Sequence, residues 1–594
     1  MAHETAPLTP MSMAALLQRI EHEWTTRKKI FDLPTARIWK PEDDIDLSFE
    51  FLGRRCATPV GPAAGPHSQL AQNIVLSWLG GSRLFELKTV QILDELEIAR
   101  PCIDMQTIGY NIEWSQELKI PQSLTEYVKA SMLIEMLQQW EPLAEHVGPN
   151  PGPWVFDMSV GYDLAGISTP EVASFIGGMA DATAEVNALR SEIASSGGAF
   201  AAMADMDFTT QISDTLTLST FHGCPPNEIE SITKHLIDEH DLDVIVKLNP
   251  TLLGYERVAA IVNDALGYAD VSVKQDAFDE DLQFDRGIEL IGELNEYAKA
   301  RHHRFGIKLT NTLVVNNTKQ WMPEDTMYLS GPPLHVLASS LLVELQNALP
   351  GLLAVPGHDG EIMVSFSAGV TKDNMADTIA MGVNPATVCS DLLKPGGYGR
   401  LQPMLRELAK AIRDSGAHNL TDWRQACQKE TVAGGHPSTA AKHVDAILHP
   451  DGVEPYHLRG NEKLPRAVDH DLEMFGCVAC NFCVTVCPND AFFSILTPDW
   501  LKEDLGDGAG RQQYMVLSEL CNECGNCMTF CPEEGDPAVI KPRLYTDADL
   551  FAQRSSQGQS FLLSADGVVG NLVQDDQVSL VDRLLATTKG NPLR

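Results

Sequence analysis

The chain has 594 residues, of which 44% are hydrophobic and 21% charged, so it can form several globular domains with large cores. Its formal net charge of −37 argues against nucleic acid or an anionic membrane as a partner. The N-terminus lacks the basic-then-apolar order of a signal peptide, and no apolar run approaches the roughly 18 residues of a membrane span. We therefore expect a cytoplasmic protein without direct membrane insertion.

Residues 1–45 are expected to form an N-terminal helical segment, because apolar residues recur at helical spacing over residues 11–31. From residue 46 to residue 413, short apolar runs alternate with longer helical patterns. Strands that alternate with helices are typical of βαβ units and a parallel sheet. Eight such units favour an α/β fold of the (β/α)8 TIM-barrel type, although a doubly wound open sheet would give the same alternation.

Nine apolar runs are candidate strands, one more than such a barrel needs. We set aside ADVSVKQD (269–276) first, because charged and amide residues follow its apolar part at once. Six of the other runs end in polar residues, and in a (β/α)8 barrel the carboxyl ends of the strands line the active site. The resulting site candidates are Lys88, Thr89, Ser159, Gly161, Tyr162, Lys247, Asn249, Asn311, Thr312, Ser367, Ala368, Gly369, Cys389, Ser390 and Asp391.

The last two of these strand ends, SFSAG (365–369) and VCSD (388–391), suit a phosphate group. Each is a short turn that opens a helical pattern, and its backbone N–H groups can bind an anion. A lysine near the first strands would suit an electron-rich ring that gains negative charge, such as a flavin on reduction. No glycine-rich dinucleotide or P-loop motif occurs, so we expect no NAD(P)H or ATP site of the chain's own.

Residues 414–468 are rich in polar residues, His, Pro and Gly, and are interpreted as a linker with one helix. A cysteine-rich domain follows at 469–546. The tail at 547–594 contains a predicted hairpin, SFLLSADGVVGNLV, with its turn at Asp-Gly.

Two copies of the pattern C-x2-C-x2-C-x3-C-P dominate the cysteine-rich domain. This spacing is that of bacterial ferredoxins, in which the fourth cysteine of each run binds the cluster of the other run. We therefore assign one [4Fe–4S] cluster to Cys477, Cys480, Cys483 and Cys531, and the other to Cys487, Cys521, Cys524 and Cys527. Zinc knuckles or a disulfide framework are the alternatives, and neither requires two full copies of this pattern.

The other five cysteines of the 13 are scattered singly along the chain. Nothing in their spacing indicates disulfides, and exposed clusters need a reducing compartment. The cysteine runs therefore predict an α+β ferredoxin-like domain that carries electrons inside the cell.

The strand ends resemble those of the flavin barrel in dihydroorotate and dihydropyrimidine dehydrogenases. ELKT at Lys88 resembles the FMN-contacting lysine segment of those enzymes, VKLNP at Lys247 their second lysine strand, and TNT at 310–312 their Asn-Thr strand. The resemblance implies that FMN is bound by the lysines and Asn311, and that its phosphate is bound by Ser367, Gly369 and Ser390. Ala368 stands where those dehydrogenases tend to have Gly.

A closer resemblance, over nearly the whole chain, is to the large subunits named as selenate reductases, a family tied to purine catabolism. It rests on phrases such as CATPVGPAAGPHSQLAQNIV, STFHGCPPNEIE, VKLNPTLLGY and DLLKPGGY, and on both cysteine runs. Longer members carry an FAD- and NAD(P)H-binding module, similar to the glutamate synthase small subunit, between the barrel and the ferredoxin domain. Its absence here implies a separate FAD/NAD(P)H-binding oxidoreductase subunit as partner.

The dehydrogenases keep a catalytic Cys or Ser on the loop after the fourth strand, which here reads STFHGCPP (219–226). Depending on where a gap is placed in the alignment with those enzymes, that position falls on Thr220 or Cys224. We prefer Cys224 as the catalytic acid or base, with His222 as the second candidate, because Thr is a poor general acid. Pro225-Pro226-Asn-Glu resembles a helix start, which would lower the pKa of an exposed Cys224 thiol; a packed, inert thiol is the alternative.

These patterns together predict an iron–sulfur flavoprotein oxidoreductase. The barrel would reduce or oxidise a small substrate, a purine- or pyrimidine-type nitrogen heterocycle by the resemblance, and two clusters would relay electrons to or from the partner. The rival hypothesis is an electron-relay or scaffold subunit, whose barrel is free of flavin and docks a separate oxidoreductase.

Overall fold

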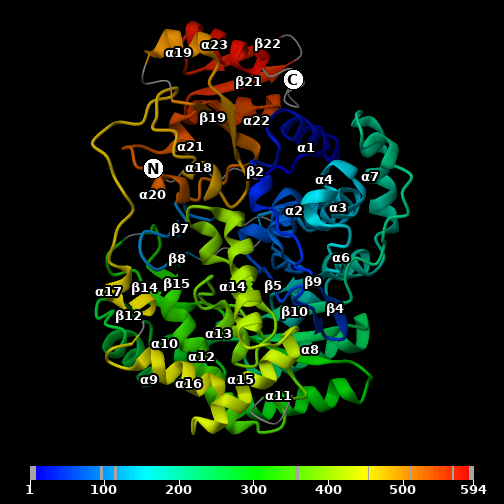
Figure 1. Ribbon diagram of the computed structural model, residues 1–594, viewed down its shortest axis with the longest axis vertical. Helices are drawn as coiled ribbons and strands as arrows, with labels where there is room; N and C mark the ends of the chain where they lie inside the picture. The colour runs from blue at the N-terminus through cyan, green and yellow to red at the C-terminus, as the bar shows by residue number, and fades with distance from the viewer. Residues whose placement is uncertain are drawn as a thin grey trace.

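The computed structural model describes residues 8–93, 98–112, 117–220, 222–320, 322–354, 360–452, 454–506, 510–564 and 567–587. A barrel with its surrounding helices forms the larger part, and a smaller domain that contains the cysteine runs lies against one end of it (Figure 1). Among the described residues, no helix is long and apolar enough to cross a membrane.

The predicted (β/α)8 barrel is confirmed. Eight parallel strands follow the order β5-β17-β16-β13-β11-β10-β9-β6, and the N–H of Arg83, just before β6, donates to the Val60 carbonyl of β5 at 3.1 Å. Gly61 allows this close approach, since a Cβ there would overlap the Leu84 carbonyl oxygen. The strands are β5 (Val60–Pro62), β6 (Leu84–Glu86), β9 (Val155–Val160), β10 (Thr215–Ser219), β11 (Asp243–Leu248), β13 (Phe305–Leu309), β16 (Met363–Phe366) and β17 (Ala386–Val388).

The surplus run ADVSVKQD lies outside the barrel, as expected. It supplies β12 (Ser272–Val273) to a second, antiparallel sheet of order β12-β14-β15-β8-β7. The other strands are β7 (Ile103–Asp104), β8 (Tyr110–Asn111), β14 (Leu313–Asn316) and β15 (Thr326–Leu329). In Figure 1 this sheet lies beside the barrel, with β7 as its strand nearest the cysteine-rich domain, and its residues Tyr110 and Tyr328 cover part of the barrel mouth.

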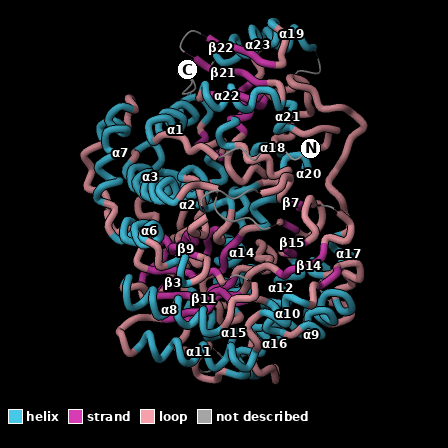
Figure 2. Tube along the Cα trace, turned by 180° about the vertical axis from the view of Figure 1, so that it is seen from behind, coloured by secondary structure: helices cyan, strands magenta, loops and turns pink. Residues whose placement is uncertain are grey.

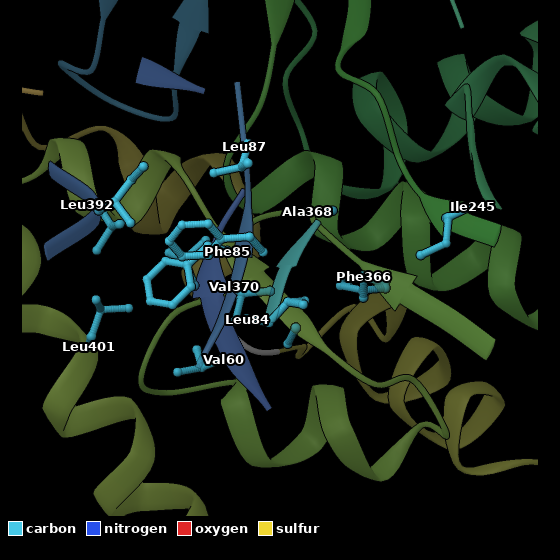
Figure 3. Packing of buried hydrophobic residues seen from close by; sticks show 14 of the residues in the cluster. Val60, Leu84, Phe85, Leu87, Ile245, Phe366, Ala368, Val370, Leu392 and Leu401 are labelled. Carbon is cyan, nitrogen blue, oxygen red and sulfur yellow. The ribbon is translucent and has the colours of Figure 1, made fainter. Parts of the chain in front are cut away.

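Apolar side chains of the strands pack against the surrounding helices, whereas a buried polar network that includes Glu86, Lys308 and Thr387 joins strands across the barrel. Val60, Leu84, Phe85 and Phe366 are fully buried in one cluster (Figure 3). The Phe85 and Phe156 rings meet edge to face with centroids 5.2 Å apart. Burial of each such side chain stabilises the fold by about 1.5–3 kcal/mol, which makes the barrel a rigid support for the residues at its mouth.

Several helices around the barrel are amphipathic, whereas the helix at 71–80 is buried on every side. Helix α8 begins at Pro226 as the sequence indicated, and it buries Ile229, Ile232, Leu236 and Ile237. Proline is favourable at this first position because no N–H is needed there. The principal helices are α2 (Ala71–Gly80), α3 (Ile120–Gln139), α6 (Pro170–Ala180), α7 (Thr183–Ser195), α8 (Pro226–His240), α11 (Phe284–Lys299), α12 (Pro332–Ala348), α13 (Met375–Ala380) and α14 (Leu401–Asp414).

The predicted N-terminal helix is α1 (Met13–Arg27), which also reaches the cysteine-rich domain, since Arg19 bonds the Asp490 carboxylate at 2.7 Å. Residues 414–468 carry more helix than expected: α15 (Leu420–Ala433), α16 (Thr439–Leu448) and the short α17 (Leu458–Asn461). His443 of α16 lies 2.9 Å from His335 of α12, measured between the Nε2 atoms. Part of the predicted linker thus packs on the barrel.

The cysteine-rich domain and the tail share one five-stranded sheet of order β18-β19-β20-β21-β22, separate from the barrel strands (Figure 2). The predicted tail hairpin is present as the antiparallel pair β21–β22, and it extends the sheet of the preceding domain; its predicted turn includes Asp566, which lies outside the described residues. The strands are β18 (Phe492–Leu496), β19 (Gln512–Leu517), β20 (Arg543–Tyr545), β21 (Ser560–Ser564) and β22 (Gly567–Asn571). The helices are α18 (Phe482–Thr485), α19 (Asp499–Leu505), α20 (Asn526–Phe530), α21 (Pro537–Ile540), α22 (Ala548–Arg554) and α23 (Asp575–Thr587).

Candidate functional site

Two adjoining cavities open at the carboxyl ends of the barrel strands. The smaller has a volume of about 180 Å³ and the larger about 620 Å³. They form one cleft, because six residues line both: Ala64, Lys88, Asn111, Lys247, Asn311 and Thr312. The structure therefore brings most of the sequence-predicted site residues together, from the ends of seven different strands.

The smaller cavity is bounded by the turns after β16 and β17. Ser367, Gly369, Cys389 and Ser390 all line it. Gly369 has a φ of 53°, and a Cβ at this position would lie 2.3 Å from the Gly331 carbonyl oxygen, so the tight turn requires glycine. Small residues and exposed backbone at these two turns leave room for a phosphate group.

Two lysines approach the floor of the cleft. Burial lowers the pKa of Lys88, and burial together with the nearby Lys308 lowers the pKa of Lys247 to about 8. Below them, Lys308 is paired with Glu86 and bonds Thr387 at 3.0 Å. Cationic groups that are desolvated in this way are stabilised by an anion or by a ring that gains negative charge.

The two predicted asparagines differ in position. Asn311 lines both cavities, and its Nδ2 donates to Asn249 Oδ1 at 2.6 Å and to the Thr220 carbonyl at 3.0 Å. Asn249 is buried and donates to Asp281 Oδ2 at 3.2 Å. Asn249 therefore fixes the amide of Asn311 and does not border the cleft itself. Thr89 lines the larger cavity, with its hydroxyl 2.8 Å from that of Ser159.

His222 projects into the larger cavity from the loop after β10. Its Nδ1 lies 3.1 Å from Asp281 Oδ2, and its ring stacks on Tyr328 of β15 with centroids 5.9 Å apart. Burial alone would raise the pKa of Asp281, but hydrogen bonds from His222 and the Gly223 N–H hold it below its usual value. An ionised carboxylate thus orients an imidazole toward the cavity.

Cys224 occupies a different environment from His222. It is 3% exposed and does not line either cavity. Burial, with Glu228 and Asp281 nearby, raises the pKa of its thiol to about 12. The helix start that follows does not offset this burial, and the geometry favours His222 over Cys224 as a group that moves protons. Thr220 also lines the larger cavity, and its hydroxyl donates to the Lys247 carbonyl at 2.8 Å.

The eight cysteines of the two runs lie in two groups, divided as the ferredoxin pattern predicts. The outer group surrounds one small cavity and consists of Cys477, Cys480, Cys483 and Cys531. Among the described residues, no group of three or more His, Cys, Asp or Glu side chains is close enough to hold a single metal ion. Cys531 belongs to the second run but joins the outer group, because a turn of helix α20 separates it from Cys527.

The inner group consists of Cys487, Cys521, Cys524 and Cys527. These thiols influence one another electrostatically, and burial raises the pKa of each. Cys524 and Cys527 are less than 10% exposed, whereas Cys480 of the outer group is exposed. The inner group is therefore enclosed between the cysteine-rich domain and the barrel.

The inner group is in direct contact with the wall of the cleft. The backbone N–H groups of Cys102 and Ile103 both donate to the Cys524 carbonyl at 3.1 Å, and Ile103 lines the smaller cavity. Arg100 bonds the Cys102 sulfur and is paired with Glu117, which also accepts from Asn522 at 2.9 Å. Residues 100–103 thus connect the cysteine-rich domain to the cleft.

Sequence reasoning missed Asp281, Tyr328 and the segment around Ile103. Asp281 and Tyr328 come from an irregular segment and from the second sheet, neither of which is a barrel strand end. Their only sequence signal was position within the long insertions between barrel strands. Such insertions on the carboxyl side of a barrel commonly carry site residues.

Comparison with protein families assigns both parts of the chain. Residues 31–435 match the family model described as oxidoreductase YgfK, N-terminal TIM-barrel domain. Residues 476–534 match the 4Fe-4S dicluster domain, which confirms the predicted ferredoxin-like domain and supports bound iron–sulfur clusters.

Two curated relatives, each described as "Putative oxidoreductase YgfK", come from Escherichia coli strains K12 and O157:H7. Each is 39% identical over 419 residues, which cover 68% of this chain and 39% of the relative. The chain therefore matches less than half the length of these relatives. Among solved structures, ligand-free DHODH from Eimeria tenella aligns with a TM-score of 0.41 and 15% identity, covering 68% of this chain and 97% of that one. The ferulenol complex of the same enzyme gives 0.40 and 14%, covering 69% and 93%.

Proposed function

The chain belongs to the YgfK oxidoreductase family, and on that premise we propose that it is an iron–sulfur flavoprotein whose barrel binds FMN. The observation that carries the proposal is the pairing of two desolvated lysines, Lys88 and Lys247, with two small-residue turns in one cleft. Bound FMN would exchange a hydride with a small substrate and pass single electrons to the clusters.

The residues around the cleft fit that group in two parts. Ser367, Gly369 and Ser390 would bind the phosphate in the smaller cavity, with Cys389 beside them. Lys88, Lys247, Asn311 and Thr312 lie where the two cavities join and would contact the ring system. Thr89 and Asn249 would contribute indirectly, by fixing the side chains of Ser159 and Asn311 through hydrogen bonds.

In the larger cavity, His222 would hold or release the proton that accompanies hydride exchange. This role for His222 is supported by its contact with Asp281 and by its position in the cavity wall. Cys224 and Thr220 are the weaker candidates for the same role. Tyr328 offers a flat ring beside His222, which suits a planar substrate. We infer a nitrogen heterocycle of purine or pyrimidine type, in keeping with the resemblance to dihydropyrimidine dehydrogenases and with a place in purine catabolism. The selenate reductase label stays a prediction.

The two cysteine groups would hold one [4Fe–4S] cluster each, in the crossed arrangement described above. A partner subunit that binds FAD and NAD(P)H, similar to the glutamate synthase small subunit, would exchange electrons with them. Its support is the resemblance to longer family members, which carry such a module between the barrel and the ferredoxin domain, where this chain has residues 414–468. Exposed clusters of this kind would function in a reducing compartment, and we retain the cytoplasm as the expected location.

Cofactor release in acid tests the proposal. One FMN and about eight irons per chain are expected from protein purified without oxygen. The same irons without flavin would instead establish the rival function, an electron-relay subunit whose barrel only docks another oxidoreductase. A chain without iron after anaerobic purification and cluster reconstitution would refute both.

A further inference from the structure

The two cysteine groups differ in what surrounds them. The inner group contacts residues 100–103 of the barrel through the carbonyl of Cys524. The outer group faces away from this contact: Cys480 is exposed, and the neighbouring Val478 is 55% exposed. An electron that left the barrel through a cluster in the inner group would therefore reach the surface at the tip formed by Val478 and Cys480.

Exposed carboxylates border this tip. Glu473 lies against Gly476, since a Cβ on that glycine would be 2.6 Å from the Glu473 carboxylate. Asp471 pairs with Glu534 through a backbone bridge, and Glu534 comes two residues after Pro532 of the outer cavity. All three acidic side chains belong to exposed residues. They form an acidic rim, defined here as Asp471, Glu473 and Glu534.

Basic side chains of the described residues also lie around the rim. Lys541 is 1% exposed and its ammonium group bonds the carbonyls of Glu473 and Met474 at 2.6 and 3.2 Å, so it acts inside the domain. Two exposed arginines lie near the tip: Arg466 comes two residues before Val468, which donates to the Pro532 carbonyl, and Arg511 follows Gly510, where a Cβ would be 2.9 Å from the Cys477 carbonyl oxygen. Glu533 is also buried and paired with His470.

We propose that the tip at Val478 and Cys480 and its acidic rim form the docking surface for a redox protein that presents an exposed cofactor edge surrounded by Lys and Arg. The inference rests on the proposed function, because it needs a cluster in the outer group. The overall charge of −37 attracts such a partner from a distance, and the rim directs it to the cluster. One electron passes per encounter: the reduced outer cluster loses it and the oxidised partner cofactor gains it, with no bond formed.

Cytochrome c is a suitable probe, since it is a basic protein with an exposed haem edge. The chain is reduced with dithionite, freed of excess reductant without oxygen, and mixed with ferric cytochrome c in a stopped-flow instrument. The variant Asp471→Lys/Glu473→Lys/Glu534→Lys is expected to reduce the haem about tenfold more slowly at low ionic strength, and the difference should vanish in high salt.

A matched control separates the rim from overall charge. Glu239→Lys/Glu256→Lys/Asp285→Lys changes the net charge equally, on helices α8, α9 (Tyr255–Ala259) and α11 at the opposite end of the molecule (Figure 1). Its rate should fall less than about twofold. Equal losses in both variants would overturn the docking surface. Iron content is measured in every sample. A chain without iron would refute the proposed function. A chain with full iron content whose rim variant reacts as fast as the unmodified chain would refute only the docking surface.

Discussion

The N–H of Ile103, a residue of the cavity wall, donates a hydrogen bond of 3.1 Å to the carbonyl oxygen of Cys524, a residue of the inner cysteine group. Pro101 of the same segment packs so closely on Gly525 that a Cβ there would lie 2.5 Å from the proline ring. The wall of the cleft and the inner cysteine group are thus joined by direct contacts of the chain. This arrangement makes the division of the cysteines into inner and outer groups testable.

Paired cysteine substitutions distinguish the crossed arrangement from one cluster per run. In the crossed arrangement Cys480 and Cys531 share a cluster, so Cys480→Ala/Cys531→Ala should lose about four of about eight irons. Cys480→Ala/Cys487→Ala should lose nearly all of them, because each substitution disrupts a different cluster. Iron is measured per folded chain after anaerobic purification.

Cys427→Ala serves as the control, since Cys427 lies outside both runs, in helix α15; its iron content should equal that of the unmodified chain. If Cys480→Ala/Cys487→Ala keeps about four irons while Cys480→Ala/Cys531→Ala loses all, each run binds its own cluster and the crossed assignment is wrong.

Cys224 should be nearly unreactive in the folded chain. Burial raises the pKa of its thiol to about 12, and only the thiolate reacts with iodoacetamide. At pH 8 we expect alkylation at least about 100-fold slower than in the urea-unfolded chain, measured by mass spectrometry of the peptide. Rapid alkylation in the native protein would restore Cys224 as the preferred acid or base over His222.

The barrel could be predicted because its strands are buried on both faces and therefore appear as short apolar runs. For the same reason ADVSVKQD is not expected in the barrel, since its apolar part is followed at once by charged and amide residues. In the structure it supplies only β12 of the second sheet. The polar strand ends located the cleft for a related reason: in a barrel of this type the carboxyl ends of the strands line the active site, so polar residues that follow an apolar run gather there.

Contacts between distant segments could not be predicted in this way. Asp281 approaches His222 across 59 positions of sequence, and no local pattern marks a carboxylate that will be buried by tertiary packing. The second sheet could not be predicted either, because β7 and β8 have two residues each and such short strands show no periodicity in the sequence. The packing of α16 on α12 was missed because helix propensity does not reveal a partner.

Loss of the Lys247 ammonium group should weaken flavin binding. A charged hydrogen bond contributes about 1.5–3 kcal/mol, so Lys247→Met is expected to raise the FMN dissociation constant by about tenfold or more, as measured by fluorescence titration of flavin-stripped protein. Lys410→Met, on the exposed side of α14, is the control. Unchanged affinity in Lys247→Met would remove the lysine from the proposed FMN site.

Asp157 beneath the cleft should make the stability of the fold depend on pH. Its carboxyl group is fully buried in β9, and burial raises its pKa to about 7 even though the hydroxyls of Thr217 and Thr215 donate to it at 2.6 and 2.7 Å. In the unfolded chain the pKa is about 3.9. Between these values the folded state binds the proton more strongly, so the free energy of unfolding falls as the pH rises from about 4 to 7, and levels off above.

The variant Asp157→Asn removes this titration while keeping the shape of the side chain. From pH 5.5 to pH 8 the free energy of unfolding of the unmodified chain should therefore fall by roughly 2 kcal/mol relative to that of the variant. Over the same range its melting temperature should fall by a few degrees relative to that of the variant. Scanning fluorimetry at several pH values measures this shift, with iron content held equal, and Asp279→Asn, an exposed carboxylate, gives the baseline. A difference that does not change with pH would show that Asp157 is ionised in the folded barrel throughout this range.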